Sequence, residues 1–322
     1  MKAIVYYNYG SSNVLQYDEI EKPAVGDNEV LLKVRAASVN PLDRHSMRGG
    51  PYVLRLLSRL GKPELKRLGR DVAGQVEAIG KNVTQFKAGD EVFGVCHGAF
   101  AEYVCASESR LVLKPENVTF EQAAAVPVAA FTALQGLRDK GRIKPGQKVL
   151  INGAAGGVGT FAVQIAKSFG AEVTGVCSTR NLEMVRALGA ERVIDYTQDD
   201  FTKEEQRYDL ILDCVGNHSL LACRRVLNPK GICVLAGAGG VWSFLSRACK
   251  GFVLSRLARQ KFVMFIARAS KEELAIMREL METGKVAPVI DRRYKLSETP
   301  EAIRYLEEGH ARGKVVITLD AS

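Results

Sequence analysis

Short apolar runs separated by polar turn residues occupy the first part of the chain, in a pattern typical of β-strands. Such runs lie at residues 2–7, 29–38 and 71–79, between turns rich in Gly, Asp and Asn. No strand–helix alternation occurs before about residue 121, so this part predicts an irregular antiparallel barrel. A mixed pattern of helices and strands returns from residue 268, and we assign that tail to the same domain.

The middle of the chain has a different pattern, in which apolar strand-like runs alternate with helical segments. Because parallel strands need crossover helices between them, residues 122–267 predict an α/β domain with a doubly wound parallel sheet. Its six strands are expected at residues 148–152, 172–177, 192–195, 208–214, 231–236 and 261–266.

A glycine-rich loop, residues 153–159, joins the first of these strands to a helix that ends at Gly170. Small residues here allow the backbone to approach a pyrophosphate, and N–H groups at the helix start then face the phosphates. Ala154 takes the first glycine position of the usual fingerprint, before Gly156 and Gly159. The loop predicts a dinucleotide site, with a purely structural turn as the alternative. The expected contacts are Ala155, Gly156, Gly157 and Val158.

The end of the second strand indicates which dinucleotide is bound. A site for NAD normally has Asp or Glu there to hold the ribose 2′-hydroxyl. This chain instead has Cys177 followed by Ser178, Thr179 and Arg180. Hydroxyl groups and a guanidinium suit a 2′-phosphate, so we predict NADP(H), with Ser178 and Arg180 as the main contacts. The alternative for Arg180 is a solvated residue at a helix start.

Composition places the chain among globular proteins without membrane spans. A hydrophobic content of 47% and a charged content of 25% are ordinary for a soluble domain, and no apolar run reaches 18 residues. The N-terminus has no signal-peptide core, and seven scattered cysteines without a C-x-x-C pair suit reduced thiols. We therefore expect a cytoplasmic protein.

The formal charge of +9 raises the question of an acidic partner. The sequence has no zinc finger and no RNA-binding consensus, so we expect no specific nucleic acid and attribute the charge to the surface and a cofactor cleft. Residues 51–70 and 240–260 are both basic and apolar. The first predicts a lid over a substrate cleft or a surface helix. The second, with Trp242, predicts a wall of the active site or a membrane-surface contact.

Several motifs occur in a fixed order along nearly the whole chain. They are Ser38-Val39-Asn40-Pro41-Leu42-Asp43, Gly69-Arg70-Asp71-Val72-Ala73-Gly74, Gly98-Ala99-Phe100-Ala101-Glu102-Tyr103, Ala125-Val126-Pro127, the glycine loop, Asp195-Tyr196 and Asp213-Cys214-Val215-Gly216. With them the chain resembles the medium-chain dehydrogenase/reductase superfamily, in its zinc-free quinone oxidoreductase-like branch. The resemblance implies a GroES-like barrel domain, residues 1–121 and 268–322, split around a Rossmann domain, residues 122–267.

The chain departs from the zinc alcohol dehydrogenases of that superfamily. Those enzymes carry a cysteine in the segment that matches residues 38–43, and a Gly-His-Glu motif where this chain has Gly69-Arg70-Asp71. Cys96 and His97 are the best remaining ligand candidates, and a zinc site needs three or four. We therefore predict no metal. Without a metal to polarise an alcohol, quinones and α,β-unsaturated carbonyls are the expected substrates.

The resemblance also implies roles for single residues. Asn40 matches a position at the nicotinamide end of the cofactor, and Tyr52 one that faces the substrate cleft, with a lid-packing role as its alternative. Asp43 and Asp71 are interpreted as structural, because acids in such turns often cap N–H groups. Further cofactor contacts are expected at Thr132, Tyr196, Val215, Gly216, Ala236, Gly237, Phe265, Ile266 and Lys314.

These observations predict an NADPH-dependent reductase of quinones or activated alkenes that needs no metal. The alternatives are a catalytically weak NADPH-sensing or RNA-binding protein of the same fold, and a peripheral membrane oxidoreductase. The resemblance implies a homodimer, in which the strand at residues 261–266 is the sheet edge and pairs with its twin.

Overall fold

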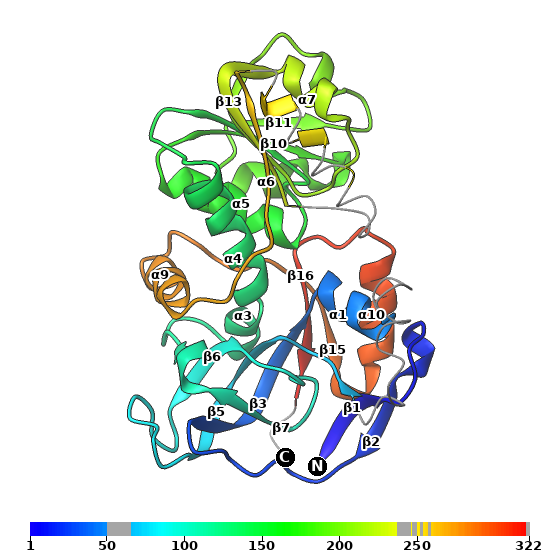
Figure 1. The fold of residues 1–322 in the computed structure, drawn as a ribbon, viewed down its shortest axis with the longest axis vertical. Coiled ribbons are helices and arrows are strands. Elements are labelled where there is room, and N and C mark those ends of the chain that lie inside the picture. The colour runs from blue at the N-terminus through cyan, green and yellow to red at the C-terminus, as the bar shows by residue number, and fades with distance from the viewer. Residues whose placement is uncertain (50–65, 237–245, 247–249, 252–253, 257–258, 320–322) are drawn as a thin grey trace. The chain divides into compact units, whose positions relative to one another are not determined.

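Two sheets of different topology dominate the computed structural model of the protein (Figure 1). It describes residues 1–49, 66–236, 246, 250–251, 254–256 and 259–319. The chain divides into two compact units. The first unit contains Met1–Val128 and Ala269–Ser322, and the second contains Ala129–Arg268.

The first unit contains a seven-stranded sheet in the order β15-β16-β3-β5-β6-β8, with β7 also paired to β3. All described neighbours are antiparallel except β15 and β16. The strands are β3 (Glu29–Val39), β5 (Asp71–Ile79), β6 (Glu91–Val95), β7 (Tyr103–Ser107), β8 (Leu111–Leu113), β15 (Ile290–Lys295) and β16 (Lys314–Thr318). A smaller sheet has the order β2-β1-β4 and consists of β1 (Lys2–Tyr6), β2 (Gln16–Glu19) and β4 (Lys66–Arg67).

β3 is the central strand of the first unit, because it pairs with β5, β7 and β16. Most of its residues are buried, and its apolar side chains join one core with Phe100, Leu111 and Ile303. The helices of this unit are α1 (Pro41–Met47), α3 (Phe120–Ala124), the start of α4 (Pro127–Leu134), α9 (Lys271–Glu282) and α10 (Thr299–Glu307). The predicted GroES-like fold class is confirmed.

The second unit contains the predicted sheet of six parallel strands, in the order β11-β10-β9-β12-β13-β14. The strand order reverses between β9 and β12, the place where doubly wound sheets bind ligands. The strands are β9 (Lys148–Asn152), β10 (Glu172–Cys177), β11 (Arg192–Asp195), β12 (Tyr208–Asp213), β13 (Leu227–Leu235) and β14 (Lys261–Met264). The main helices are α5 (Gly157–Ser168), α6 (Leu182–Ala187), α7 (Leu220–Arg225) and the π-helix Gln135–Lys140.

Some boundaries differ from the predicted ones. Helices α3 and α4 are separate, because Pro127 has no N–H group to continue α3 and instead starts α4. Residues 66–67, at the end of the stretch predicted as helical, form β4. Residues 51–65, Trp242 and most of the second basic apolar stretch lie outside the described residues. Among the helices that are described, none has both the length and the apolar character needed to cross a membrane.

Helix α5 packs closely on the end of β9, and Gly159 makes that contact possible. A Cβ atom at Gly159 would lie 2.0 Å from the carbonyl oxygen of Gly153 and 2.8 Å from the backbone of Ala154. At Gly156 the nearest described atom, also the Gly153 oxygen, would be 3.4 Å away. The two glycines therefore differ in function: one allows helix packing, and the other leaves an open place beside the loop.

We predict that Gly159→Ala destabilises the protein by about 3 kcal/mol, the upper end of typical overpacking costs, because the clashing atoms belong to the backbone. Gly156→Ala, with φ of −83°, is the matched control and is expected to cost about 1 kcal/mol or less. Urea unfolding measures both values. Equal losses in the two variants would contradict the assignment of the packing role to Gly159.

Candidate functional site

A buried acid, Asp71, lies where three strands of the first unit begin or end. β5 begins at Asp71, which pairs with Ser38 near the end of β3. β16 begins at Lys314, next to the pair of Val315 with Val39. Because both neighbours are antiparallel to β3, their first residues lie beside its last ones, and polar side chains from all three strands meet.

Asp71 accepts hydrogen bonds from four donors. Its Oδ2 accepts from the Ser38 hydroxyl at 2.7 Å, the Asn40 side-chain amide at 2.9 Å and the Lys314 ammonium at 3.3 Å. Its Oδ1 accepts from the backbone N–H of Val128 at 3.0 Å. The side chain of Asp71 is completely buried, and these donors replace the water that a buried carboxylate loses.

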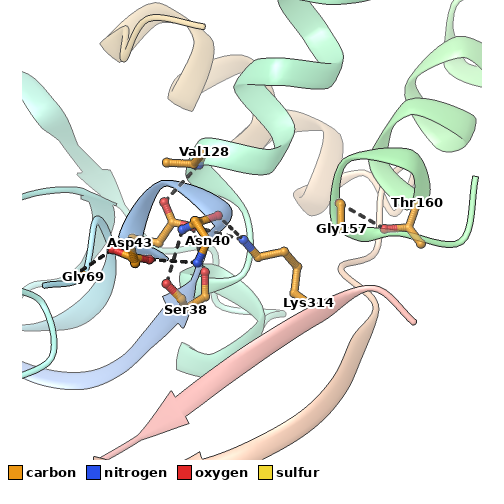
Figure 2. A network of polar contacts seen from close by, with 9 residues as sticks. Ser38, Asn40, Asp43, Gly69, Val128, Gly157, Thr160 and Lys314 are labelled. Carbon is orange, nitrogen blue, oxygen red and sulfur yellow. Dashed lines mark hydrogen bonds and ion pairs between the residues drawn. The ribbon is translucent and has the colours of Figure 1, made fainter. Parts of the chain in front are cut away.

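Lys314 and Asn40, two of the predicted site residues, are in direct contact. The Lys314 Nζ donates to the Asn40 Oδ1 at 2.7 Å, and Figure 2 shows their side chains directed toward each other. The Asn40 Nδ2 donates to Asp71 and, at 3.3 Å, to the carbonyl oxygen of Ser38. The cation on one side and the carboxylate on the other thus determine which way the Asn40 amide points.

Asp43 is a second buried acid in the same segment. Asn40 is the N-cap of α1, and Asp43 accepts from the Asn40 backbone N–H at 2.8 Å and from the Gly69 N–H at 3.1 Å. Burial raises the pKa of Asp43 to about 7, although these two N–H groups and Lys314 lower it; the nearby Asp71 raises it further. At neutral pH this carboxyl is therefore partly protonated.

The sequence predicts structural roles for Asp43 and Asp71, and Ser38 has no predicted role beyond its place in a motif. These three residues belong to two motifs, at residues 38–43 and 69–74, which are far apart in the sequence. Only the pairing register of β3 with β5 shows that the two motifs meet. The capping role predicted for Asp43 is observed, whereas Asp71 contacts two predicted site residues.

In the second unit, three predicted cofactor contacts lie around the end of β12. The Asp213 Oδ1 accepts from the backbone N–H groups of Val215 at 3.2 Å and Gly216 at 2.8 Å. It also accepts from the side chain of Asn152, at the end of β9, at 2.9 Å. The N–H of Ala236, just after β13, donates to the Asp213 carbonyl oxygen at 2.9 Å.

The glycine loop follows β9 directly, so it lies at the same carboxyl edge. Ala155 and Gly156 belong to the loop, and Gly157 and Val158 form the first turn of α5. Figure 2 includes this first turn, where the Thr160 hydroxyl donates to the Gly157 carbonyl oxygen at 3.4 Å. The four predicted phosphate contacts are thus consecutive residues of one loop-to-helix junction.

The residues after β10 provide the predicted 2′-phosphate contacts. The hydroxyl oxygen of Ser178 is half-buried and accepts from the Asn181 side chain at 3.1 Å. Arg180 is exposed. The Asn181 Oδ1 is buried and has no hydrogen-bond partner among the described residues. A buried oxygen of this kind indicates a place for an additional donor.

An acid of the Asp195-Tyr196 motif, for which the sequence predicts no separate role, lies close by. Asp195, at the end of β11, pairs with Cys177 of β10. It accepts from the Thr179 hydroxyl at 2.5 Å and from the N–H and hydroxyl of Thr197 at 3.0 and 2.8 Å. The hydrogen bond from Thr179, followed by those from Thr197, holds the pKa of Asp195 below its ordinary value. Its oxygens are thus already engaged by the chain's own donors.

The remaining predicted contacts are spread over the second unit. Thr132 is half-buried in α4, and Tyr196 follows β11 with 54% exposure. β14 ends before Phe265 and Ile266, and Ile266 is 77% exposed. Tyr52 and Gly237 lie outside the described residues.

The predicted absence of a metal stays a prediction. Within the described part of the chain, no group of three or more His, Cys, Asp or Glu side chains is arranged to hold an ion. Burial raises the pKa of the Cys96 thiol to about 12, and the His97 Nε2 lies 3.2 Å from the Arg70 guanidinium. A protonated thiol and a ring paired with a cation are poor zinc ligands.

Two family profiles match the chain. Residues 26–116 match the family described as alcohol dehydrogenase GroES-like domain. Residues 188–317 match the family described as zinc-binding dehydrogenase.

Individual proteins are similar over nearly the full length of the chain. The 2-methylene-furan-3-one reductase of Solanum lycopersicum is 35% identical over 98% of this chain and 79% of its own length. The mitochondrial NAD(P)H oxidoreductase RTN4IP1 of Mus musculus is 36% identical over 99% of this chain and 89% of its own. The solved quinone oxidoreductase of Coxiella burnetii is 33% identical, with a TM-score of 0.88 over 99% of both chains.

The raised pKa of Asp43 predicts a pH dependence of stability. Because the folded-state pKa of about 7 exceeds the ordinary value of 3.8, the folded protein holds a proton between these values that the unfolded chain releases. The contribution of Asp43 to stability is therefore fully present below about pH 4 and is lost as the pH rises toward 7.

We expect the unfolding free energy of the wild type, relative to Asp43→Asn, to fall by up to roughly 4 kcal/mol over this range. Urea unfolding at several pH values measures the difference, with the exposed Asp199→Asn as control. A difference that is constant with pH would contradict the titration of Asp43.

Proposed function

We propose that this protein is an NADPH-dependent reductase of quinones or α,β-unsaturated carbonyls. The premise is its family: the chain belongs to the quinone oxidoreductase-like branch of the medium-chain dehydrogenase/reductase superfamily. The observation that carries the proposal is the extent of the similarity. The relatives named 2-methylene-furan-3-one reductase and quinone oxidoreductase match 98% and 99% of the chain, so both units are included. The names of these relatives also support a more general statement, that the chain is an oxidoreductase that uses a nicotinamide cofactor.

The residues of the second unit fit a nicotinamide dinucleotide. The place beside Gly156 is open, and the start of α5 presents N–H groups that have no acceptor within the helix. Gly156, Gly157 and Val158 would hold the pyrophosphate. Around β12 and β13, we propose Val215, Gly216 and Ala236 as contacts; Thr132, Tyr196, Gly237, Phe265 and Ile266 stay predicted contacts.

The choice of NADP over NAD rests on the segment after β10. Ser178 and Arg180 would donate to the 2′-phosphate. The buried Asn181 oxygen would accept a hydrogen bond from a ribose hydroxyl. Because the Ser178 hydroxyl can donate as well as accept, the Asn181 amide can also take the reverse orientation and direct its NH₂ group toward the ligand. Asp195 is an acid in contact with this segment through Thr179. Since Thr179 and Thr197 occupy its oxygens, we do not assign it to the ribose hydroxyls of NAD.

In the proposed reaction, NADPH when bound supplies the hydride that reduces the conjugated acceptor. The contribution of the chain is position and polarity. Lys314 and Asp71 hold the Asn40 amide in one orientation. Its NH₂ group donates to Asp71 and to the Ser38 carbonyl, so its oxygen, which accepts one bond from Lys314, would accept a second from a ribose hydroxyl. Tyr52 is proposed to donate a hydrogen bond or the proton to the reduced substrate.

We further propose a homodimer, because β14 is the last strand of the parallel sheet and no strand among the described residues pairs with its outer edge. The cytoplasmic location stays a prediction. One close relative is named as mitochondrial, and the name of a relative does not locate this chain.

The proposed function is tested by mixing purified protein and NADPH with a panel of quinones, alkenals and enones and following NADPH absorbance. We expect turnover of at least one class, unchanged after treatment with a metal chelator. Asn40→Ala should lower kcat/KM on the order of a hundredfold, because misplacement of a bound reactant by about 1 Å can cost that much. A folded wild-type protein that oxidises NADPH with none of these acceptors would overturn the proposal.

The cofactor choice has its own test. Arg180→Gln should weaken NADPH binding by roughly ten- to a hundredfold, the cost of losing a charge-assisted hydrogen bond, and leave NADH almost unaffected. Arg186→Gln, an exposed arginine of the next helix that pairs with Glu183, is the control. A wild type that binds NADH more tightly than NADPH would contradict the role given to Ser178 and Arg180.

A further inference from the structure

The first unit contains a small cavity of about 200 Å³ whose walls carry an excess of positive charge. Its lining includes Lys66, Arg67 and Arg70, together with Tyr6 and His97. The acid on the described wall is Asp43, whose carboxyl also caps α1. None of the three cations belongs to the site proposed above, so the cavity is a separate feature that borders it at Asp43.

The backbone places these cations close together. β4 pairs antiparallel with β1, so that Lys66 lies opposite Tyr6. The chain then turns at Gly69, where φ is +99° and a Cβ atom would lie 2.7 Å from the backbone nitrogen of Phe100. Only glycine fits this turn, and the turn brings Arg70 back to the same cavity as Lys66.

Arg67 is accommodated by a second glycine. A Cβ atom at Gly98 would lie 3.0 Å from both the Cβ and the Nε of Arg67. The Arg67 side chain therefore lies directly against the backbone of residue 98. Loss of that glycine would displace the guanidinium from its place in the wall.

The partners that the structure gives to the other two cations are neutral. The Lys66 ammonium lies 4.2 Å from the centroid of the Tyr9 ring and bonds its hydroxyl. The Arg70 Nη1 lies 3.2 Å from the His97 Nε2. Burial, followed by Arg70 and Arg110, lowers the pKa of His97, so the ring is neutral at pH 7 and accepts from the guanidinium. These contacts fix the cations in position without cancelling their charge.

Asp43 does not neutralise the wall either. Both of its carboxyl oxygens are already engaged, one by the Asn40 N–H and the other by the Gly69 N–H. Burial also raises its pKa to about 7, so it carries only part of a negative charge at neutral pH. Three fixed cations in one concave site, opposed by at most one charge, create a potential that attracts a small anion.

We propose that this cavity binds a carboxylate of the substrate, so that the preferred acceptors are enones or quinones carrying an acid group. The proposal rests on the proposed function. The cavity borders Asn40 through Asp43, and at about 200 Å³ it is smaller than the 300–1,000 Å³ typical of whole-ligand pockets. It is therefore suited to one charged end of a ligand, and planar guanidinium groups match a carboxylate in particular.

The test compares two acceptors that share one conjugated enone. One carries a carboxylate separated from the alkene by two methylene groups, and the other is its methyl ester. We expect kcat/KM with NADPH to be on the order of tenfold higher for the acid, as a charge-assisted contact allows. Arg70→Met should bring the ratio close to one by lowering the value for the acid and not for the ester. Arg67→Met is the second variant, in case Arg70→Met does not fold.

Lys230→Met, which removes an exposed cation of the second unit, is the control and should keep the ratio. Turnover of both acceptors with no preference for the acid would overturn the inference and leave the proposed function intact. So would a preference that persists in Arg70→Met and Arg67→Met.

A binding measurement separates this inference from the proposed function if no acceptor is turned over. Isothermal titration of butanoate, and separately of inorganic phosphate, is carried out at constant ionic strength. Binding of butanoate that is lost in Arg70→Met supports the carboxylate site. Binding of phosphate alone, or of neither anion, contradicts it.

Discussion

The burial of one carboxylate, that of Asp71, is the constraint on which the candidate site depends. Transfer of such a group out of water costs several kcal/mol unless its oxygens receive donors of good geometry. The donors here are a hydroxyl, an amide, an ammonium and a backbone N–H, and they come from β3, the loop before α1, β16 and α4. In the observed register all four segments donate to Asp71, so the burial of this acid favours that register.

This constraint also explains why the first unit contains both ends of the chain. Lys314 is 274 residues from Asn40 in sequence and 2.7 Å from it in space. β16 brings the ammonium there because it pairs antiparallel with β3, with Val315 opposite Val39. A chain that lacked its last strand would leave the Asn40 amide without the cation that orients its oxygen. The second unit is inserted between two segments of the first unit, and the contact between Asn40 and Lys314 forms only when β16 pairs with β3.

The elements with local signals could be predicted from the sequence. The glycine loop, the six parallel strands and the capping of α1 each depend on residues within one turn or one strand–helix junction, and their physical causes are visible there. Asp71 could not be recognised in this way. An acid at the start of a strand has the same local pattern whether it caps a turn or receives an ammonium from a residue 243 positions away.

The cationic cavity was missed for a related reason. Lys66, Arg67 and Arg70 end a stretch whose leucines and arginines recur at helical spacing, and this periodicity predicted a lid or a surface helix. Pairing with β1 overrides that local preference at residues 66–67. Likewise, Asp195 follows a different strand from the one where an NAD-selecting acid is expected. Its proximity to Thr179 follows from strand order alone.

The position of Asp43 shows why an acid is used where an amide would avoid the cost of burial. Two backbone N–H groups, from Asn40 and Gly69, point at this side chain from different segments. A carboxylate offers two acceptor oxygens, whereas an asparagine offers one and would direct its NH₂ group at the other N–H. The raised pKa is the consequence of burying this side chain between the two loops, and the two N–H groups only partly offset the effect of burial. One of those loops carries the Asn40 amide and the other leads to Arg70, so the same acid fixes the distance between the proposed ribose contact of Asn40 and the cationic cavity.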